Sequence, residues 1–276
     1  FLSTCVNVPE GNRSDTAKYM RSIVARSLIL NFGIVGLALL PALHCPAERW
    51  EQADGYRFVP IQVNSGSSAG FNLLDSKATG IIFSNTLAVS RIMQNHNFMN
   101  GSGVAAGDFD NDGGCDLYFC AIDGTNVLYR NLGGMQFEDV TATAGVGCPR
   151  LHSTGAVFAD VDGDGRVDLL VSTLGQGVHC FMNEGNGRFR ESTAEAGLVS
   201  QTGSTTLALA DVDGDGTLDL YVANYGALSL YRSGGSIQVR QENGKWVVIG
   251  PNSDRLRYVN GKIQEVGEAD VLHLND

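Results

Sequence analysis

Asp108-Phe-Asp110-Asn-Asp112-Gly113-Gly-Cys-Asp116 is a nine-residue stretch that the chain repeats at residues 160–168 and 211–219. Each copy has aspartate at positions 1, 3, 5 and 9 and glycine at position 6, and the copies start 52 and 51 residues apart. Four carboxylates so close together repel one another, and a hard divalent cation relieves that repulsion. Oxygen-rich loops of this kind suit calcium. The sequence therefore predicts a repeat protein with three calcium loops.

The flanks of these loops distinguish them from EF-hands, which also open with D-x-D-x-D-G. An EF-hand needs a glutamate at loop position 12 and a helix on either side. Position 12 is Phe119, Val171 or Val222 here. The flanks are short apolar runs rich in β-branched and aromatic residues, which indicate buried strands. Each repeat is therefore expected to be a hairpin whose tip is the calcium loop.

The repeat continues beyond the loop. We expect a third strand at residues 127–131, 178–183 and 228–232, and a fourth at 137–141 and 189–193. About four short strands in roughly 50 residues are typical of a β-propeller blade. A β-solenoid with calcium turns is the alternative, but its period would be much shorter. The predicted fold is all-β, a β-propeller of four-stranded antiparallel blades, and residues 48–276 are too few for most complete rings.

The repeats resemble the FG-GAP/VCBS units of integrin α-chain propellers and, more closely, the cartilage-acidic-protein group, which often carries an ASPIC/UnbV domain. The residues that carry this resemblance are 79–85, 101–108, 128–131, 137–141 and 211–224. The resemblance covers about residues 70–232. It implies calcium ligands from the side chains at loop positions 1, 3, 5 and 9 and the carbonyl at position 7. About three Ca²⁺ ions are then expected, with these ligands: Asp108, Asp110, Asp112, Gly114, Asp116; Asp160, Asp162, Asp164, Arg166, Asp168; Asp211, Asp213, Asp215, Thr217, Asp219.

The chain departs from this pattern in three places. Asn111 and Gly114-Cys115 replace the residues of the other loops, so we expect looser geometry in the first loop. Residues 233–276 lose the blade pattern, and their two Asn-Gly pairs between apolar runs predict hairpins, as an insertion or a divergent blade. No ASPIC/UnbV-like segment is visible, so functions tied to that domain are not carried over.

Residues 1–47 are predicted to be an N-terminal leader. Arg21 and Arg26 precede the uncharged stretch 27–43, and small residues follow up to Ala47, which is the pattern of a secretory signal starting at Met20. An uncleaved membrane anchor is the alternative. Export is consistent with the predicted calcium loops, because extracellular calcium modules bind too weakly to be saturated at cytosolic calcium concentrations. We expect a secreted or cell-surface protein, with membrane contact only through such an anchor.

Composition limits the other possibilities. The net charge is −11, and the twelve loop aspartates account for more than all of it, which argues against nucleic-acid binding. Cys115, Cys120, Cys148 and Cys180 would remain after cleavage, and they allow either disulfides or buried thiols.

Catalytic motifs are scarce. His96, His152, His179 and His273 are scattered, and Ser102 lies in a glycine turn without the context of a nucleophile. We expect no enzyme, but a calcium-binding module for adhesion or scaffolding whose ligand is an extracellular protein or glycan. The alternative is the propeller part of a larger extracellular hydrolase or lyase whose active site lies elsewhere.

Overall fold

The chain divides into two units, residues 1–71 and 72–276. The structure is a computed structural model that describes residues 51–53, 56–58, 70–227 and 236–275. In the first unit, β1 (Glu51–Ala53) and β2 (Tyr56–Phe58) pair as an antiparallel hairpin. The predicted leader, residues 1–47, lies outside the described residues. None of the helices in the described part has the length and apolarity that a bilayer crossing requires.

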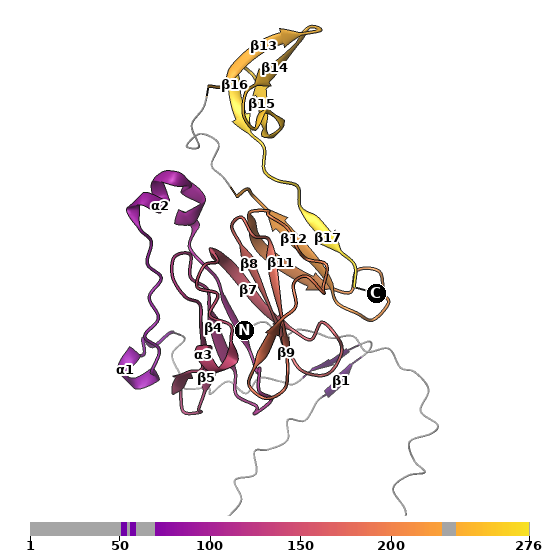
Figure 1. Cartoon of the computed structure of the whole chain (residues 1–276). Coiled ribbons are helices and arrows are strands. Elements are labelled where there is room, and N and C mark those ends of the chain that lie inside the picture. Colours follow the sequence, from indigo (N-terminus) through magenta and orange to yellow (C-terminus); the bar gives the residue numbers. More distant parts are fainter. Residues whose placement is uncertain (1–50, 54–55, 59–69, 228–235, 276) are drawn as a thin grey trace, which may run out of the picture. The chain divides into compact units, whose positions relative to one another are not determined.

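The second unit contains three antiparallel sheets that correspond to the predicted blades (Figure 1). In the first two blades, four strands pair in the order of the chain. Blade 1 consists of β3 (Val104–Gly107), β4 (Asp116–Phe119), β5 (Val127–Asn131) and β6 (Phe137–Asp139). Blade 2 consists of β7 (Ser153–Ala159), β8 (Asp168–Thr173), β9 (Val178–Asn183) and β10 (Phe189–Glu191). This confirms an all-β, propeller-type fold, and the described blades do not close a ring.

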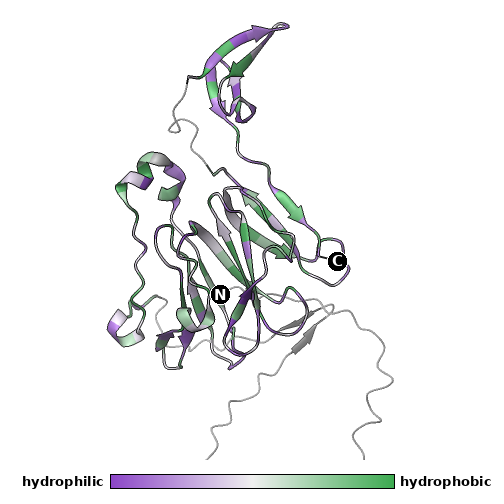
Figure 2. Ribbon diagram, viewed as in Figure 1, coloured by the Kyte–Doolittle hydropathy of each residue, from purple (hydrophilic) through white to green (hydrophobic). Residues whose placement is uncertain are grey.

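The core lies between successive blades. In β8, Leu169 and Val171 join the cluster shared with blade 1, whereas Leu170 joins the cluster shared with blade 3. Side chains alternate between the two faces of a strand, and both faces of β8 are covered, so its central residues, Leu169 to Val171, are all apolar. In Figure 2 the hydrophobic colour follows much of the central strands of the blades. Because both faces are buried, a continuous apolar run marks such a strand, and this is the pattern from which the sequence analysis predicted the strands.

The first strands of adjacent blades approach each other closely. The N–H of Gly103 donates to the carbonyl of Thr154 at 2.8 Å, and the hydroxyl of Thr154 donates to the carbonyl of Ser204 at 2.7 Å. A Cβ atom on Gly103 would lie 3.0 Å from the Cα atom of Gly155. Glycine therefore permits this approach.

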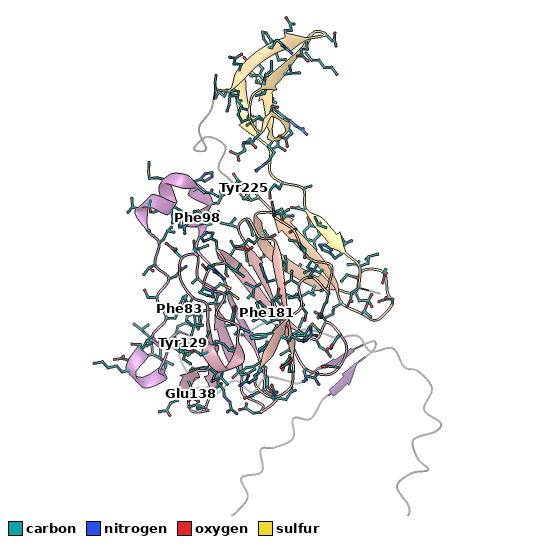
Figure 3. The ribbon with its side chains drawn as sticks, in the orientation of Figure 1. Phe83, Phe98, Tyr129, Glu138, Phe181 and Tyr225 are labelled. Carbon is teal, nitrogen blue, oxygen red and sulfur yellow. The ribbon has the colours of Figure 1, made fainter. Side chains whose placement is uncertain are left out.

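The residues before blade 1 cover its outer side. Phe83 stacks on Phe119 with ring centroids 5.1 Å apart, and Phe119 meets Tyr129 edge-on. Phe83 and Tyr129 are labelled in Figure 3. The segment starts with the short helix α1 (Ser76–Thr79), which ends at Gly80 with φ 77°. A helix of the same kind, α3 (Thr141–Ala144), follows β6 and ends at Gly145 with φ 79°. Two further helices precede β3, namely α2 (Val89–Gln94) and η2 (His96–Asn100).

The third blade receives its third described strand from late in the chain. Its first two strands are β11 (Ser204–Ala210) and β12 (Asp219–Asn224), as expected. Its third strand in the described part of the chain is β17 (Val271–His273), which pairs with β12. The third strand predicted at residues 228–232 lies outside the described residues. β12 is therefore paired on both edges, by β11 and by β17. Residues 225–270 are therefore an insertion between the second and third strands of this blade.

The insertion contains the two predicted hairpins. β13 (Gln238–Glu242) pairs with β14 (Lys245–Ile249), and β15 (Leu256–Val259) pairs with β16 (Lys262–Glu265), with η3 (Ser253–Arg255) between the hairpins. Both residues of each Asn-Gly turn have positive φ, as hairpin turns of type I′ require. The prediction of hairpins is confirmed.

The four described cysteines form no disulfide. Cys120 and Cys180 are buried, and burial raises the pKa of Cys120 to about 12 and that of Cys180 to about 11. These thiols pack as small apolar groups. The alternative of buried free thiols therefore applies to them.

Candidate metal sites

The three acidic stretches form the tips of the hairpins between the first and second strands of each blade. We call residues 108–116 loop 1, residues 160–168 loop 2 and residues 211–219 loop 3. The last aspartate of each loop pairs with the last residue of the first strand, as Gly107 with Asp116, so that the ladder ends at the loop. Regular strand pairing thus places the same four carboxylates at the same edge of every blade.

Three carboxylates converge in each loop. One carboxylate oxygen from each aspartate at positions 1, 3 and 9 lies within 4.8 Å of the others, in three groups: Asp108, Asp110 and Asp116; Asp160, Asp162 and Asp168; Asp211, Asp213 and Asp219. Such an all-oxygen set, on a backbone turn that offers carbonyls, suits a hard cation with flexible coordination. Nine of the twelve predicted aspartates are therefore brought together.

The first aspartate shapes the loop. In loop 1, Asp108 accepts hydrogen bonds from the N–H groups of Asp112 at 3.1 Å and Gly113 at 2.9 Å. Loop 2 repeats this pattern with Asp160. Asn111 has φ 58° and takes the left-handed conformation that Gly163 has in loop 2, which asparagine tolerates. The expectation of looser geometry in loop 1 is therefore wrong, because asparagine replaces glycine there without changing the turn.

Loop 3 is the loop that differs. Asp211 accepts from Gly214 at 2.6 Å and from Gly216 at 3.1 Å, so its first hydrogen bond comes from position 4 rather than position 5. The second bond, to the glycine at position 6, is common to all three loops.

The ninth aspartate is buried in every loop, at most 1% exposed. One oxygen of Asp116 accepts from the N–H of Phe109 at 3.0 Å and the other from the N–H of Asn131 at 2.8 Å. Burial raises the pKa of Asp116 and of Asp168, and these N–H groups oppose that rise. A buried carboxylate beside two others is the arrangement that a bound cation would stabilise.

An asparagine that the sequence analysis missed completes each site. Asn131, Asn183 and Asn275 each donate a backbone N–H to the ninth aspartate, at 2.8, 2.8 and 3.0 Å. Their side chains donate to the carbonyl of the loop residue before that aspartate. The sequence carries a signal for them, because each ends an apolar run that begins with valine: residues 127–131, 178–183 and 271–275.

The aspartate at position 5 has another role. Asp112, Asp164 and Asp215 each accept the N–H of the residue two positions further on, at 2.8–2.9 Å, which is an Asx turn. The N–H of Gly114, and then the guanidinium of Arg130, lower the pKa of Asp112. These three aspartates lie outside the converging groups. They and the carbonyls of Gly114, Arg166 and Thr217 remain predicted ligands.

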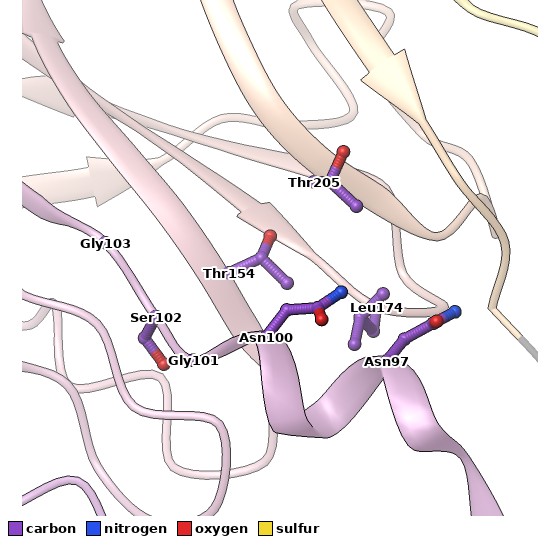
Figure 4. Close-up of a pocket in the computed structure, with 8 residues that line it drawn as sticks. All are labelled: Asn97, Asn100, Gly101, Ser102, Gly103, Thr154, Leu174 and Thr205. Carbon is purple, nitrogen blue, oxygen red and sulfur yellow. The ribbon is translucent and has the colours of Figure 1, made fainter.

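Outside the loops, the structure places a polar pocket of about 240 Å³ beside the starts of the first strands (Figure 4). None of the eight residues that line it is ionisable: Asn97, Asn100, Gly101, Ser102, Gly103, Thr154, Leu174 and Thr205. The hydroxyl of Ser102 accepts from Asn85 at 3.0 Å. Ser102 therefore lies without an acid or base among the residues of its own pocket.

The predicted histidines have separate surroundings. His152 lies 2.7 Å from the carbonyl of Ile122, and His179 lies 3.6 Å from Glu191. His96 meets the ring of Tyr225 edge-on, and His273 lies on β17. These contacts do not bring the four histidines together into one site.

Comparison with known proteins agrees with this architecture. The model of the FG-GAP-like repeat family matches residues 108–171 and 160–222, which run from loop 1 into β12. Cartilage acidic protein 1 of Mus musculus is 28% identical over 151 residues, which cover 52% of this chain and 23% of that protein. The human protein is 28% identical over 154 residues, which cover 53% of this chain and 22% of that protein. The match thus spans less than a quarter of the length of these curated relatives, and neither is named as an enzyme.

Proposed function

We propose that the FG-GAP-like repeats bind three calcium ions and that the chain is part of a secreted, calcium-stabilised binding module. The observation that carries this proposal is the convergence of three carboxylates in each loop, repeated three times in blades that pack on one another. The residues fit the ion, because every side-chain donor in these groups is a hard oxygen and one of the three is already buried.

Bound calcium would supply positive charge that holds the tip of each hairpin together. The chain's own residues do the rest: the asparagine of the third strand positions the ninth aspartate, and the first aspartate orders the turn. The similarity to cartilage acidic protein supports an extracellular location. The ligand is then an extracellular protein or glycan bound by the loops between blades, in adhesion or scaffolding.

Calcium titration of the full chain by calorimetry tests the metal part of this proposal. We expect about three ions, and each of Asp162→Ala and Asp213→Ala should remove one of them. When the free calcium concentration is 100-fold above the dissociation constant of a site, binding at that site adds about 2.7 kcal/mol to the free energy of unfolding. Asp254→Ala is a control, because Asp254 is an exposed acid outside the loops. Unchanged stoichiometry and melting temperature in both loop variants would refute the metal role.

A further inference from the structure

The three loops differ in the cations that contact their aspartates. In loop 1, the Nε atom of Arg130 lies 2.6 Å from Oδ2 of Asp110, and its Nη2 atom lies 3.1 Å from Oδ2 of Asp112. Asp110 belongs to the converging group of this loop. A guanidinium therefore already neutralises part of the first site.

Loop 2 uses its arginine differently. Arg166 pairs with Asp164 through Nη2, and its Nε donates to the carbonyl of Asn183 at 2.9 Å. Asp164 lies outside the converging group of loop 2. This ion pair therefore engages none of the three converging carboxylates.

Loop 3 lacks such a cation in the part of the chain that the structure describes. Thr217 stands where loop 2 has Arg166, and its hydroxyl donates to Asp215 at 2.7 Å. No ion pair to lysine or arginine reaches Asp211, Asp213 or Asp219 among the described residues.

The register of the third strands explains why only loop 1 has this contact. Arg130 immediately precedes Asn131, the asparagine that binds the ninth aspartate. The residue that precedes the corresponding asparagine is Met182 in blade 2 and Leu274 in blade 3. The difference between the loops therefore rests on one side chain at one equivalent position.

We propose that Arg130 is a built-in counter-ion of loop 1, which makes loop 1 the weakest of the three calcium sites. This inference rests on the proposed function. Calcium entering loop 1 must break the contact of Arg130 with Asp110 and then lie near a positive charge, whereas loops 2 and 3 impose no such penalty on their converging groups. The guanidinium of Arg130 is partly exposed, and solvent screens its charge. We therefore expect the calcium dissociation constant of loop 1 to be about tenfold higher than those of loops 2 and 3.

The test compares the full chain with Arg130→Met, which copies Met182 of blade 2. Calorimetry of the wild type should resolve two tighter ions and one weaker ion, and the variant should bind all three within about threefold of one another. Cys115 reports on loop 1 directly, because it is an exposed thiol at position 8 of that loop. The calcium concentration at which its alkylation rate changes should fall about tenfold in the variant.

Two further variants make the result specific. Leu274→Arg places a guanidinium at the equivalent position of blade 3, where the side chain is 54% exposed, and should weaken loop 3 by a similar factor. Arg190→Met removes the same charge outside the loops, at an exposed pair with Glu195, and should change nothing. Three ions with equal affinity in the wild type, or a Cys115 response unchanged by Arg130→Met, would overturn the inference. No calcium binding to any chain would instead refute the proposed function.

Discussion

An asparagine at or just after the end of the third strand connects the loop of its own blade with the loop of the preceding blade in blades 2 and 3. The backbone N–H of Asn183 donates to Asp168, and its Nδ2 atom donates both to Val167 and, at 2.7 Å, to Phe109 in the loop of the preceding blade. Asn275 repeats this link, with a bond of 2.8 Å to Val161 in loop 2. These side chains therefore connect each loop to the one before it.

We expect Asn183→Ala to lower the free energy of unfolding by about 2–3 kcal/mol, because it leaves buried carbonyl groups without donors. Asn183 is 3% exposed. The matched variant is Asn131→Ala, which removes a partly exposed side chain that donates only to Cys115 of its own blade and should cost about 1 kcal/mol. Urea unfolding of both variants in the presence of chelator measures the difference. Equal losses would mean that the bond to Phe109 adds no stability.

At the scale of the elements, β9 differs from its counterparts by a histidine. His179 occupies the position of Val127 in β5 and Val271 in β17, counted back from the asparagines. Burial lowers the pKa of His179, and Glu191 on β10, 3.6 Å away, opposes that effect. Its Nε2 atom is buried without a hydrogen-bond partner.

This position predicts a pH dependence. Because the pKa of His179 is lower in the folded protein, the unfolded chain binds more protons below the ordinary histidine value of 6.5, so the free energy of unfolding falls as pH falls through that range. His179→Val should remove this contribution, and Glu191→Gln should enlarge it by removing the opposing charge. Urea unfolding at pH 5 and pH 7.5 compares the three proteins. An identical pH dependence in all three would contradict the assignment.

The sequence predicts strands and loops well where the same motif and the same apolar flanks occur three times. Short apolar runs bounded by Gly/Asp turns identified the first two strands of every blade, and the repeated motif included the nine converging aspartates. Strand β17 was missed because the prediction placed the third strand of blade 3 soon after the second, at residues 228–232, whereas the asparagine that marks the third strand stands at position 275. The contact of Arg130 with Asp110 was not predictable, because it depends on strand register between residues far apart in the sequence. The Asx turn of Asp112 likewise depends on backbone geometry that the motif alone does not specify.

At the scale of the whole second unit, blade 3 is completed by a segment that returns after the inserted hairpins. Glu268 holds this returning segment against blade 3, because its carboxylate accepts hydrogen bonds from the N–H groups of Gly203 at 2.6 Å and Ala227 at 3.0 Å. Asp270 then accepts the N–H of Asn224 at 2.8 Å and the hydroxyl of Tyr221 at 2.6 Å. The stability of blade 3 therefore depends on residues 268–275, which follow the insertion.

A chain that stops after Ala269 tests this dependence. It lacks β17 and Asn275, so β12 loses a strand partner, Asp219 loses an N–H donor and the carbonyl of Val161 loses the hydrogen bond that Asn275 donates. We expect a lower melting temperature in chelator and, if the loops bind calcium, two ions instead of three. The comparison variant replaces residues 238–249 with a Gly-Ser linker, which removes more residues but keeps β17, and it should retain the third ion. If the linker variant lost as much stability as the truncated chain, the hairpin of β13 and β14 would support blade 3 as much as β17 does, which would contradict this dependence.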